Sequence, residues 1–321
     1  MAQVLVTGAT GMIGSHLLAH LRDSPPGAVV GTVFGPPSEL PAPPAHIMLP
    51  LDVRDGPALR DCIARHRPAV IHHLAAQSLP TLSWTEPRMT LDTNVQGTVN
   101  VFEAVQQVRE TIDAEYDPMV VVACSSAEYG ASMTPDRVPL DEEAPLLPLH
   151  PYGVSKVAQD LLAFQYWRNR RIRCIRARIF NTTGPGKRDD VVSDFAARVA
   201  RIQAEGGTLR VGNLDARRPI MDVRDTIAAL LLLAGRGEPG EAYNVCGDSA
   251  VRIGELIPIF ERLAGTALPV AQDAALLRPS DERVILGSNA KLRARTGWRP
   301  TVALEETLRA VLDHEIARGA R

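Results

Sequence analysis

The chain has 321 residues, 45% of them apolar and 22% charged, which is long enough for two domains and typical of a globular protein. Its 35 basic and 37 acidic side chains nearly cancel, so its charge gives no reason to expect nucleic acid as a partner. No apolar run reaches the roughly 20 residues of a membrane span, and the N-terminus lacks the basic region of a signal peptide. The four cysteines are widely spaced, which predicts buried, reduced thiols in a cytoplasmic protein without a metal site.

The first half of the chain alternates short apolar runs with amphipathic helical patterns. Strands are expected at 4–6, 28–34, 69–74, 119–123 and 174–179, and helices at about 55–65, 90–108 and 151–167. Strands that are apolar on both faces, each followed by a helix, are typical of a parallel sheet covered on both sides. We therefore predict an α/β fold with a Rossmann-type doubly wound parallel sheet.

The second half is richer in loops and indicates a smaller C-terminal lobe. Helices are expected at about 192–205, 223–233, 253–264 and 304–317. We expect a dinucleotide-binding domain at 1–178 with a return segment at about 219–247, and a substrate lobe at 179–321. Five prolines within residues 36–44 predict an exposed connection, because proline blocks strand pairing.

A glycine loop joins the first predicted strand to the first helix. It runs from Thr7 to Gly14 and places glycines at positions 8, 11 and 14. Such glycines permit a tight turn, close approach of the backbone to a pyrophosphate, and close packing of the helix on the strand. The N-terminus of the helix would then present free N–H groups to the phosphates. The loop therefore predicts dinucleotide binding.

Tyr152 and Lys156 are four residues apart and so share one face of a predicted helix. The chain contains only three lysines among its 35 basic residues, so a lysine at this position suggests that a compact ammonium group is required. We expect this cation to lower the pKa of the tyrosine toward the range of a proton shuttle. Ser125 follows the strand at 119–123, where side chains of a parallel sheet line the ligand crevice. These three residues are the predicted catalytic set.

Together, these motifs resemble the extended short-chain dehydrogenase/reductases, also called the NAD-dependent epimerase/dehydratase family. The resemblance runs nearly end to end, and within the family it is greatest to the GDP-mannose 4,6-dehydratases and GDP-4-keto-6-deoxy-D-mannose reductases. Its supporting stretches are Asp52-Val53, His73-Leu74-Ala75-Ala76-Gln77-Ser78, Asn94-x-x-Gly97-Thr98, Tyr152-x-x-x-Lys156, Arg178-x-Phe180-Asn181, Val211-Gly212-Asn213-Leu214-Asp215-Ala216-Arg217-Arg218, Tyr243-Asn244-Val245 and Arg278-Pro279-Ser280-Asp281.

The resemblance implies an NAD(P)-dependent enzyme of nucleotide-sugar and deoxysugar metabolism, with two sets of binding residues. The expected cofactor contacts are Gly8, Thr10, Gly11, Met12, Ile13, Asp52, Val53, Leu74, Ala75, Ala76, Gln77, Asn94, Tyr152, Lys156 and Ile179. The expected substrate contacts are Ser78, Ser126, Asn181, Arg188, Arg218, Arg278 and Asp281. The three arginines among them would suit a pyrophosphate because the guanidinium offers a bidentate fork.

One departure from the dehydratase pattern decides between activities. The dehydratases carry an acidic residue where this chain has Ala127, and that carboxylate removes the C5 proton and assists loss of water. The neighbouring Glu128 is an unsuitable replacement, because adjacent residues of an extended segment point to opposite faces. The sequence thus favours a reductase of a nucleotide-linked 4-keto-6-deoxy sugar, GDP-linked. A C4 epimerase, a 4,6-dehydratase and a non-catalytic dinucleotide-sensing module remain alternatives.

The cofactor and the assembly are also expectations at this level. The residues that end the second predicted strand, 30–35, offer neither an acid for a ribose hydroxyl nor an arginine for a 2′-phosphate, so NADP and NAD both stay open, with NADP favoured for a reductase. The helices at 90–108 and 151–167 match those that pair family subunits, which predicts a homodimer with a nucleotide-sugar substrate, and without nucleic acid or membrane partners.

Overall fold

A computed structural model describes residues 3–22, 28–35, 47–277 and 282–319. The predicted proline-rich connection at 36–44 lies outside these residues. Within the described ranges the main sheet has seven strands in the order β11-β6-β5-β4-β1-β2-β3, and every pairing is parallel. The strands are β1 Val4–Thr7, β2 Val29–Val33, β3 Ile47–Pro50, β4 Val70–His73, β5 Met119–Ser125, β6 Cys174–Ile179 and β11 Ala242–Val245. The predicted doubly wound α/β fold is confirmed.

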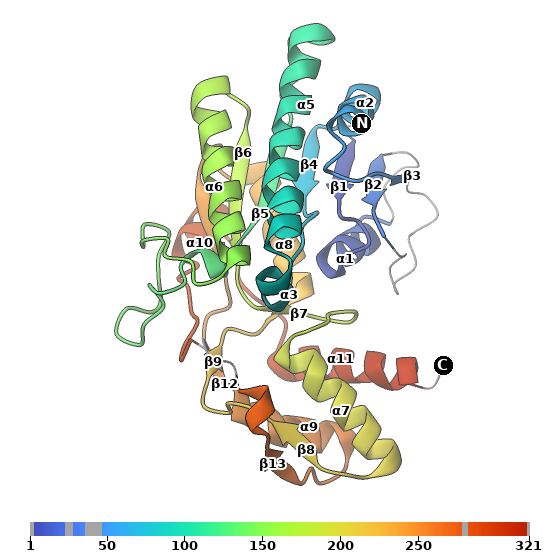
Figure 1. Ribbon diagram of the computed structural model, residues 1–321, viewed down its shortest axis with the longest axis vertical. Coiled ribbons are helices and arrows are strands. Elements are labelled where there is room, and N and C mark those ends of the chain that lie inside the picture. Colours follow the sequence, from blue (N-terminus) through green and yellow to red (C-terminus); the bar gives the residue numbers. More distant parts are fainter. Residues whose placement is uncertain (1–2, 23–27, 36–46, 278–281, 320–321) are drawn as a thin grey trace.

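Helices cover both faces of this sheet (Figure 1). One face carries α2 (Gly56–His66), α5 (Gly97–Thr111) and α6 (Pro151–Arg170), and their apolar side chains join those of the strands in one buried cluster. The other face carries α1 (Met12–His20), α8 (Val223–Arg236) and α10 (Ala290–Thr296). Because both faces are buried, the strands are continuously apolar, as the sequence pattern indicated.

The predicted helix at 90–108 is three consecutive segments in the structure. These segments are the end of α4 (Pro87–Leu91), a π-helical turn at Asp92–Gln96, and α5, and the short helix α3 (Pro80–Thr85) precedes them. Asn94, in that turn, exchanges hydrogen bonds with the backbone of Gln77, its Oδ1 accepting from the N–H at 2.8 Å. Single π turns often mark functional sites, and here the turn directs Asn94 inward.

The C-terminal lobe lies beyond the end of the sheet (Figure 1) and has an apolar core of its own. It is built by α7 (Val191–Glu205), α9 (Leu256–Ala264) and α11 (Leu304–Gly319), with β8 (Leu209–Val211) paired to β13 (Val270–Gln272). The remaining short elements are the strands β7 Thr182–Thr183, β9 Arg217–Arg218, β10 Met221–Asp222 and β12 Val251–Arg252, and the 3₁₀ turns η2 Ser126–Glu128, η3 Ile253–Glu255 and η4 Ala274–Leu276.

Two expectations about chain chemistry can be compared with the structure. All four cysteines are buried and free, as predicted. None of the helices among the described residues has the length and apolar character that crossing a bilayer requires.

Candidate active site

A pocket of about 950 Å³ lies where the carboxyl ends of the parallel strands face the C-terminal lobe. Its wall combines segments far apart in the sequence: the loops after β1, β4, β5 and β6, the start of α6, and parts of α7, β8 and η4. This is the position at which ligands bind in open α/β sheets. Most of the predicted site residues line this one cavity.

The glycine loop forms one end of the pocket. Gly8 has a φ of +68°, and a Cβ at this position would lie 2.8 Å from the backbone of Ala75. A Cβ at Gly14 would lie 2.3 Å from the carbonyl oxygen of Gly8, so the loop is closed tightly against the start of α1. Gly11 precedes α1 without a side-chain capping bond, so the first N–H groups of the helix face the cavity. This cradle of backbone donors fits a dinucleotide pyrophosphate.

Tyr152 and Lys156 lie on α6, which begins at Pro151 with the Nδ1 of His150 accepting a hydrogen bond from the N–H of Gly153. Both side chains are buried but line the pocket. Lys156 Nζ donates to the carbonyl oxygen of Ala123 at 2.7 Å and lies 5.7 Å from the centre of the tyrosine ring.

The electrostatics of this pair differ from the sequence expectation. Burial raises the pKa of Tyr152 to about 12, against a hydrogen bond with Ser125 that lowers it. Burial also lowers the pKa of Lys156 to about 8, since desolvation disfavours the charged form of each group. The expected lowering of the tyrosine pKa by Lys156 is not found, because burial dominates, and the phenol keeps its proton at neutral pH.

Ser125 ends β5 and caps the short 3₁₀ turn η2. Its Oγ accepts a hydrogen bond from the backbone N–H of Ala127 at 3.2 Å. The hydroxyl proton is thus available to a partner in the pocket, where Tyr152 lies beside it.

Ala127 lines the pocket, whereas Glu128 does not. The segment is a 3₁₀ turn and not extended, so the reasoning from alternation was wrong in its premise. The two side chains nevertheless diverge: Glu128 is fully buried, and one of its carboxylate oxygens lies 3.3 Å from Nε of Arg178. No carboxylate from this turn reaches the cavity.

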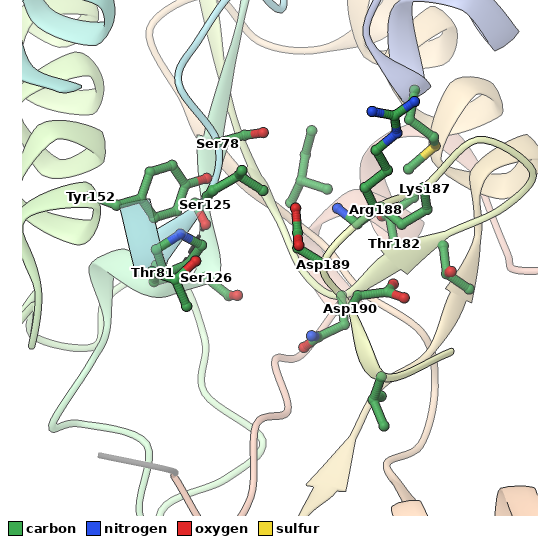
Figure 2. Close-up of a pocket in the computed structure, with 18 of the residues that line it drawn as sticks. Ser78, Thr81, Ser125, Ser126, Tyr152, Thr182, Lys187, Arg188, Asp189 and Asp190 are labelled. Atoms are coloured by element: carbon green, nitrogen blue, oxygen red, sulfur yellow. Dashed lines mark hydrogen bonds between the residues drawn. The ribbon is translucent and has the colours of Figure 1, made fainter. Parts of the chain in front are cut away.

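Hydroxyl groups and charges occupy opposite sides of the pocket (Figure 2). Ser78, Thr81, Ser125 and Ser126 lie near Tyr152 on one side. Across from them lies the loop after β7 that carries Lys187, Arg188, Asp189 and Asp190. A ligand between the two sides would meet hydrogen-bond donors at one end and charged groups at the other.

The remaining predicted residues fall into three groups. Thr10, Gly11, Met12, Ile13, Val53, Leu74, Ala75, Ala76, Ile179, Asn181 and Arg218 line the pocket with those already described. Gln77 and Asn94 do not, being buried behind its wall, where Asn94 also donates to Ser155 Oγ at 2.9 Å. Arg278 and Asp281 lie outside the described residues.

Several pocket residues were missed by the sequence reasoning. They include Thr81, His150, Lys187, Asp189, Arg198, Arg210 and Glu282. Lys187 had a usable signal, since it is one of only three lysines and directly follows the Gly-Pro-Gly loop. The others come from the short helix α3, from loops and from the polar sides of elements in the lobe, where apolar periodicity does not reveal which polar side chain faces the pocket.

Asp52 and Phe34 line the pocket just after the ends of β3 and β2. Asp52 lines the pocket, and its carboxylate accepts from Nε and the terminal nitrogen of Arg54 at 2.9 and 2.6 Å. This guanidinium lowers the pKa of Asp52 and lies over the ring of Phe34, 5.3 Å from its centre. Residues 28–35 bring no carboxylate to this part of the pocket.

Comparison with known proteins gives a consistent result. The family model described as GDP-mannose 4,6 dehydratase matches residues 5–311. The GDP-6-deoxy-D-mannose reductase of Pseudomonas aeruginosa is 33% identical over 97% of this chain and 96% of its own length. The structure of RMD from Pseudomonas aeruginosa complexed with NADPH has a TM-score of 0.84 and 30% identity, covering 99% of this chain and 100% of that one. The UDP-glucose 4-epimerase of Thermus thermophilus in complex with NAD has a TM-score of 0.82 and 27% identity, covering 99% and 100%.

Proposed function

Because the chain belongs to the GDP-mannose 4,6-dehydratase family of nucleotide-sugar enzymes, we propose that it is the reductase variant of that chemistry. Its substrate is a GDP-linked 4-keto-6-deoxy sugar, and its product is the corresponding 4-hydroxy sugar. Enzymes of the family use NAD(P), in agreement with the sequence prediction.

The observation that carries this proposal is the side chain at position 127. Eliminating water from a hexose requires a base at the C5 proton, within roughly 3 Å of it. Ala127 offers no such group, and Glu128 is buried outside the pocket, with one carboxylate oxygen 3.3 Å from Nε of Arg178. A 4-keto sugar that has already lost water needs no base of this kind.

The protonated state of Tyr152 is compatible with reduction. Reduction begins with a neutral phenol that gives its proton to the carbonyl oxygen, whereas an epimerase or a dehydratase must first remove a proton from the C4 hydroxyl. Burial raises the pKa of Tyr152 to about 12, so the phenol carries a proton at neutral pH that it can transfer to the carbonyl oxygen. The bound nicotinamide cofactor supplies the hydride.

Three side chains then have separate roles at the reacting carbonyl. Tyr152 donates its proton to the oxygen, and the Ser125 hydroxyl donates a hydrogen bond to the same atom. Lys156, fixed by its bond to Ala123, would hold the ribose next to the nicotinamide and stabilise the phenolate that forms. Proton delivery of this kind contributes about 10²–10⁴-fold to the rate.

We assign the other predicted residues by their places in the pocket. The glycine loop with Thr10, Met12 and Ile13 would hold the pyrophosphate of the cofactor, and Asp52, Val53, Leu74, Ala75, Ala76 and Ile179 would line its adenosine and nicotinamide ends. Gln77 and Asn94 act from behind the wall. Ser78, Ser126, Asn181, Arg188 and Arg218 would contact the nucleotide sugar. NADPH is the proposed cofactor, since the similar structure of RMD from Pseudomonas aeruginosa is complexed with NADPH and residues 28–35 lack the acid that an NAD site presents to the ribose.

We also propose a homodimer formed through α5 and α6, which lie side by side on one face of the sheet (Figure 1). Val154, Leu161 and Phe164 share one side of α6 and are 48%, 52% and 43% exposed. Leu91 on α4 and Trp84 on α3 add exposed apolar surface nearby. Contiguous apolar patches of this kind are typical of interfaces.

The domain division is proposed as predicted, with one addition. Residues 1–178 and 219–247 would form the dinucleotide-binding domain, and the rest of residues 179–321 the substrate lobe, whose core from Val192 to Leu312 is separate. Helix α10 packs its Leu292 against the sheet, as does Trp298, so we add this segment to the first domain.

A substrate panel tests the proposal. The protein is incubated with NADPH and either GDP-mannose or its 4-keto-6-deoxy derivative, and the products are analysed by mass spectrometry. We expect the keto sugar to gain the mass of one hydride and one proton, while GDP-mannose stays unchanged. Loss of the mass of one water from GDP-mannose would contradict the proposal and identify a dehydratase.

A further inference from the structure

Glu128 is an ionisable group that the proposed mechanism does not use. It is fully buried directly behind the reacting residues, although it neither lines the pocket nor lies on the surface. Burying a carboxyl group is costly unless it forms specific bonds, so its partners indicate what it does.

The first partner is Ser125. Oε1 of Glu128 accepts a hydrogen bond from the backbone N–H of Ser125 at 2.8 Å. In return the Ser125 side chain accepts from the backbone of the same turn, which completes a capping box. The box fixes Ser125 at two points, its own N–H and its Oγ, and leaves the hydroxyl proton directed elsewhere.

The second partner is Arg178, which connects Glu128 to the helix of the reacting tyrosine. Nε of Arg178 lies 3.3 Å from Oε2 of Glu128 and donates to Oδ2 of Asp160 at 2.9 Å. Asp160 continues the stripe of Tyr152 and Lys156 along α6, because the three residues are spaced by four. Glu128 thus joins the end of β5 to the helix that faces it.

The surrounding charges leave Glu128 little freedom. Cys124, Glu128 and Asp160 bring ligand atoms within 4.8 Å of one another, with Lys156 and Arg178 as the nearby cations. Burial and the neighbouring Asp160 raise the pKa of Glu128, whereas the guanidinium of Arg178 acts to lower this pKa. In either protonation state an acceptor oxygen remains for the N–H of Ser125.

We propose that Glu128 is a positioning residue, which holds the Ser125 hydroxyl in line with Tyr152 and the reacting carbonyl by accepting the Ser125 backbone N–H. The identity of the carbonyl rests on the proposed function, but the hold on Ser125 does not. What matters is the reach of the acceptor oxygen and not the charge of the carboxylate.

Two substitutions separate reach from charge. Glu128→Gln keeps an oxygen at the same distance and removes the charge, whereas Glu128→Asp keeps the charge and shortens the side chain by one carbon. We expect Glu128→Asp to lower kcat roughly tenfold or more with little change in KM, because small misplacements of reacting groups are costly. Glu128→Gln should stay within about threefold of the unaltered protein. A larger loss of kcat in Glu128→Gln than in Glu128→Asp would overturn the proposal.

A double substitution shows whether the effect passes through Ser125. In a Ser125→Ala background, Glu128→Asp should cost no further activity, because the hydroxyl that it positions is already absent. If Glu128→Asp lowers kcat by the same factor in both backgrounds, Glu128 serves the fold alone and the proposal fails.

A spectroscopic measurement gives the same answer without any substrate. The chain has five tyrosines, so ¹³Cζ-labelled tyrosine yields a resolvable set of signals, and Tyr152→Phe assigns the relevant one. Ser125→Ala should shift this signal, because the serine side chain lies beside Tyr152 (Figure 2) and lowers the pKa of its phenol. Glu128→Asp should reproduce that shift and Glu128→Gln should not. An unmoved Tyr152 signal in Glu128→Asp would refute the positioning role, whatever the panel of sugars shows.

Discussion

At the scale of single residues, burial controls the chemistry of the pocket. Tyr152 and Lys156 are both enclosed, and desolvation favours the neutral form of each: the pKa of Tyr152 is raised to about 12 and that of Lys156 is lowered to about 8. The tyrosine is therefore protonated at neutral pH and up to about pH 11. The lysine is the group of this pair whose charge changes near neutral pH.

We predict that turnover falls as the pH rises through about 8. The ammonium form of Lys156, which stabilises the developing phenolate, is lost there, although a lysine in water would stay charged to above pH 10. The three lysines make this visible by NMR of ¹³Cε-labelled lysine in the cofactor-free protein, with Lys156→Arg removing the assigned signal. A Lys156 signal that titrates above pH 10 would contradict this account.

The same shift has a consequence for stability. Between about pH 8 and 10.5 the unfolded chain still binds a proton at this lysine, whereas the folded chain does not. The contribution of Lys156 to the free energy of unfolding therefore increases as the pH rises through this window. Below pH 8 the folded chain holds a buried ammonium group, and the desolvation of this group lowers the free energy of unfolding by its full amount.

Tyr152→Phe should abolish turnover while leaving the fold and cofactor binding intact. The ring still packs, but the transferable proton is gone, so we expect kcat to fall about 10²–10⁴-fold. Tyr166→Phe is the matched control, because Tyr166 lies on the same helix with its hydroxyl bonded to Glu103 and not to the pocket. Steady-state rates and fluorescence titration with NADPH measure both effects. More than half the original rate in Tyr152→Phe would remove this residue from the mechanism.

Ala127→Glu tests the meaning of the missing carboxylate. Placing an acid in the pocket should permit at most a trace of water elimination from GDP-mannose, because a base must also be aligned with the C5 proton. Ala127→Gln has the same size without the base and should show none. Equal elimination by the two variants, measured by mass spectrometry, would mean that position 127 does not separate these activities.

At the scale of elements, the sequence predicted what depends on periodic patterns. Strand β6 and the helices α2, α7 and α11 lie within a few residues of their predicted bounds, because their buried positions repeat at regular intervals. The π turn at Asp92–Gln96 and the 3₁₀ turn at Ser126–Glu128 were not predicted. Both contain side chains that hydrogen-bond to the backbone, Asn94 in the first and Glu128 in the second, and such bonds leave no periodic signal.

The exposed apolar side of α6 gives a prediction about assembly. Leu161→Asp should place a charge in the proposed dimer interface and yield monomers. Ile316→Asp, on the similarly exposed face of α11, is the control and should leave the assembly unchanged. Light scattering at micromolar concentration measures the mass. A particle of 34.7 kDa for the unaltered chain would rule out the proposed dimer.

At the scale of the whole molecule, the pocket is made by bringing loops of the sheet against the C-terminal lobe. Sequence reasoning located the half contributed by the parallel strands, since the carboxyl ends of such strands meet along one edge. It missed several pocket residues that the lobe contributes, among them Arg198, Arg210 and Glu282. Their inward position follows from how the lobe packs on the sheet, and no local motif encodes that arrangement.

We propose that the protein transfers a hydride from its cofactor to a keto sugar in a net reduction, so that the cofactor ends oxidised. The most direct measurement uses NADPH carrying deuterium at the transferred position of C4, together with the GDP-linked 4-keto-6-deoxy sugar. The account predicts one deuterium at C4 of the sugar and one oxidised cofactor for each product molecule. A product without deuterium, formed while the cofactor stays reduced, would contradict it and indicate an isomerisation in place of a reduction.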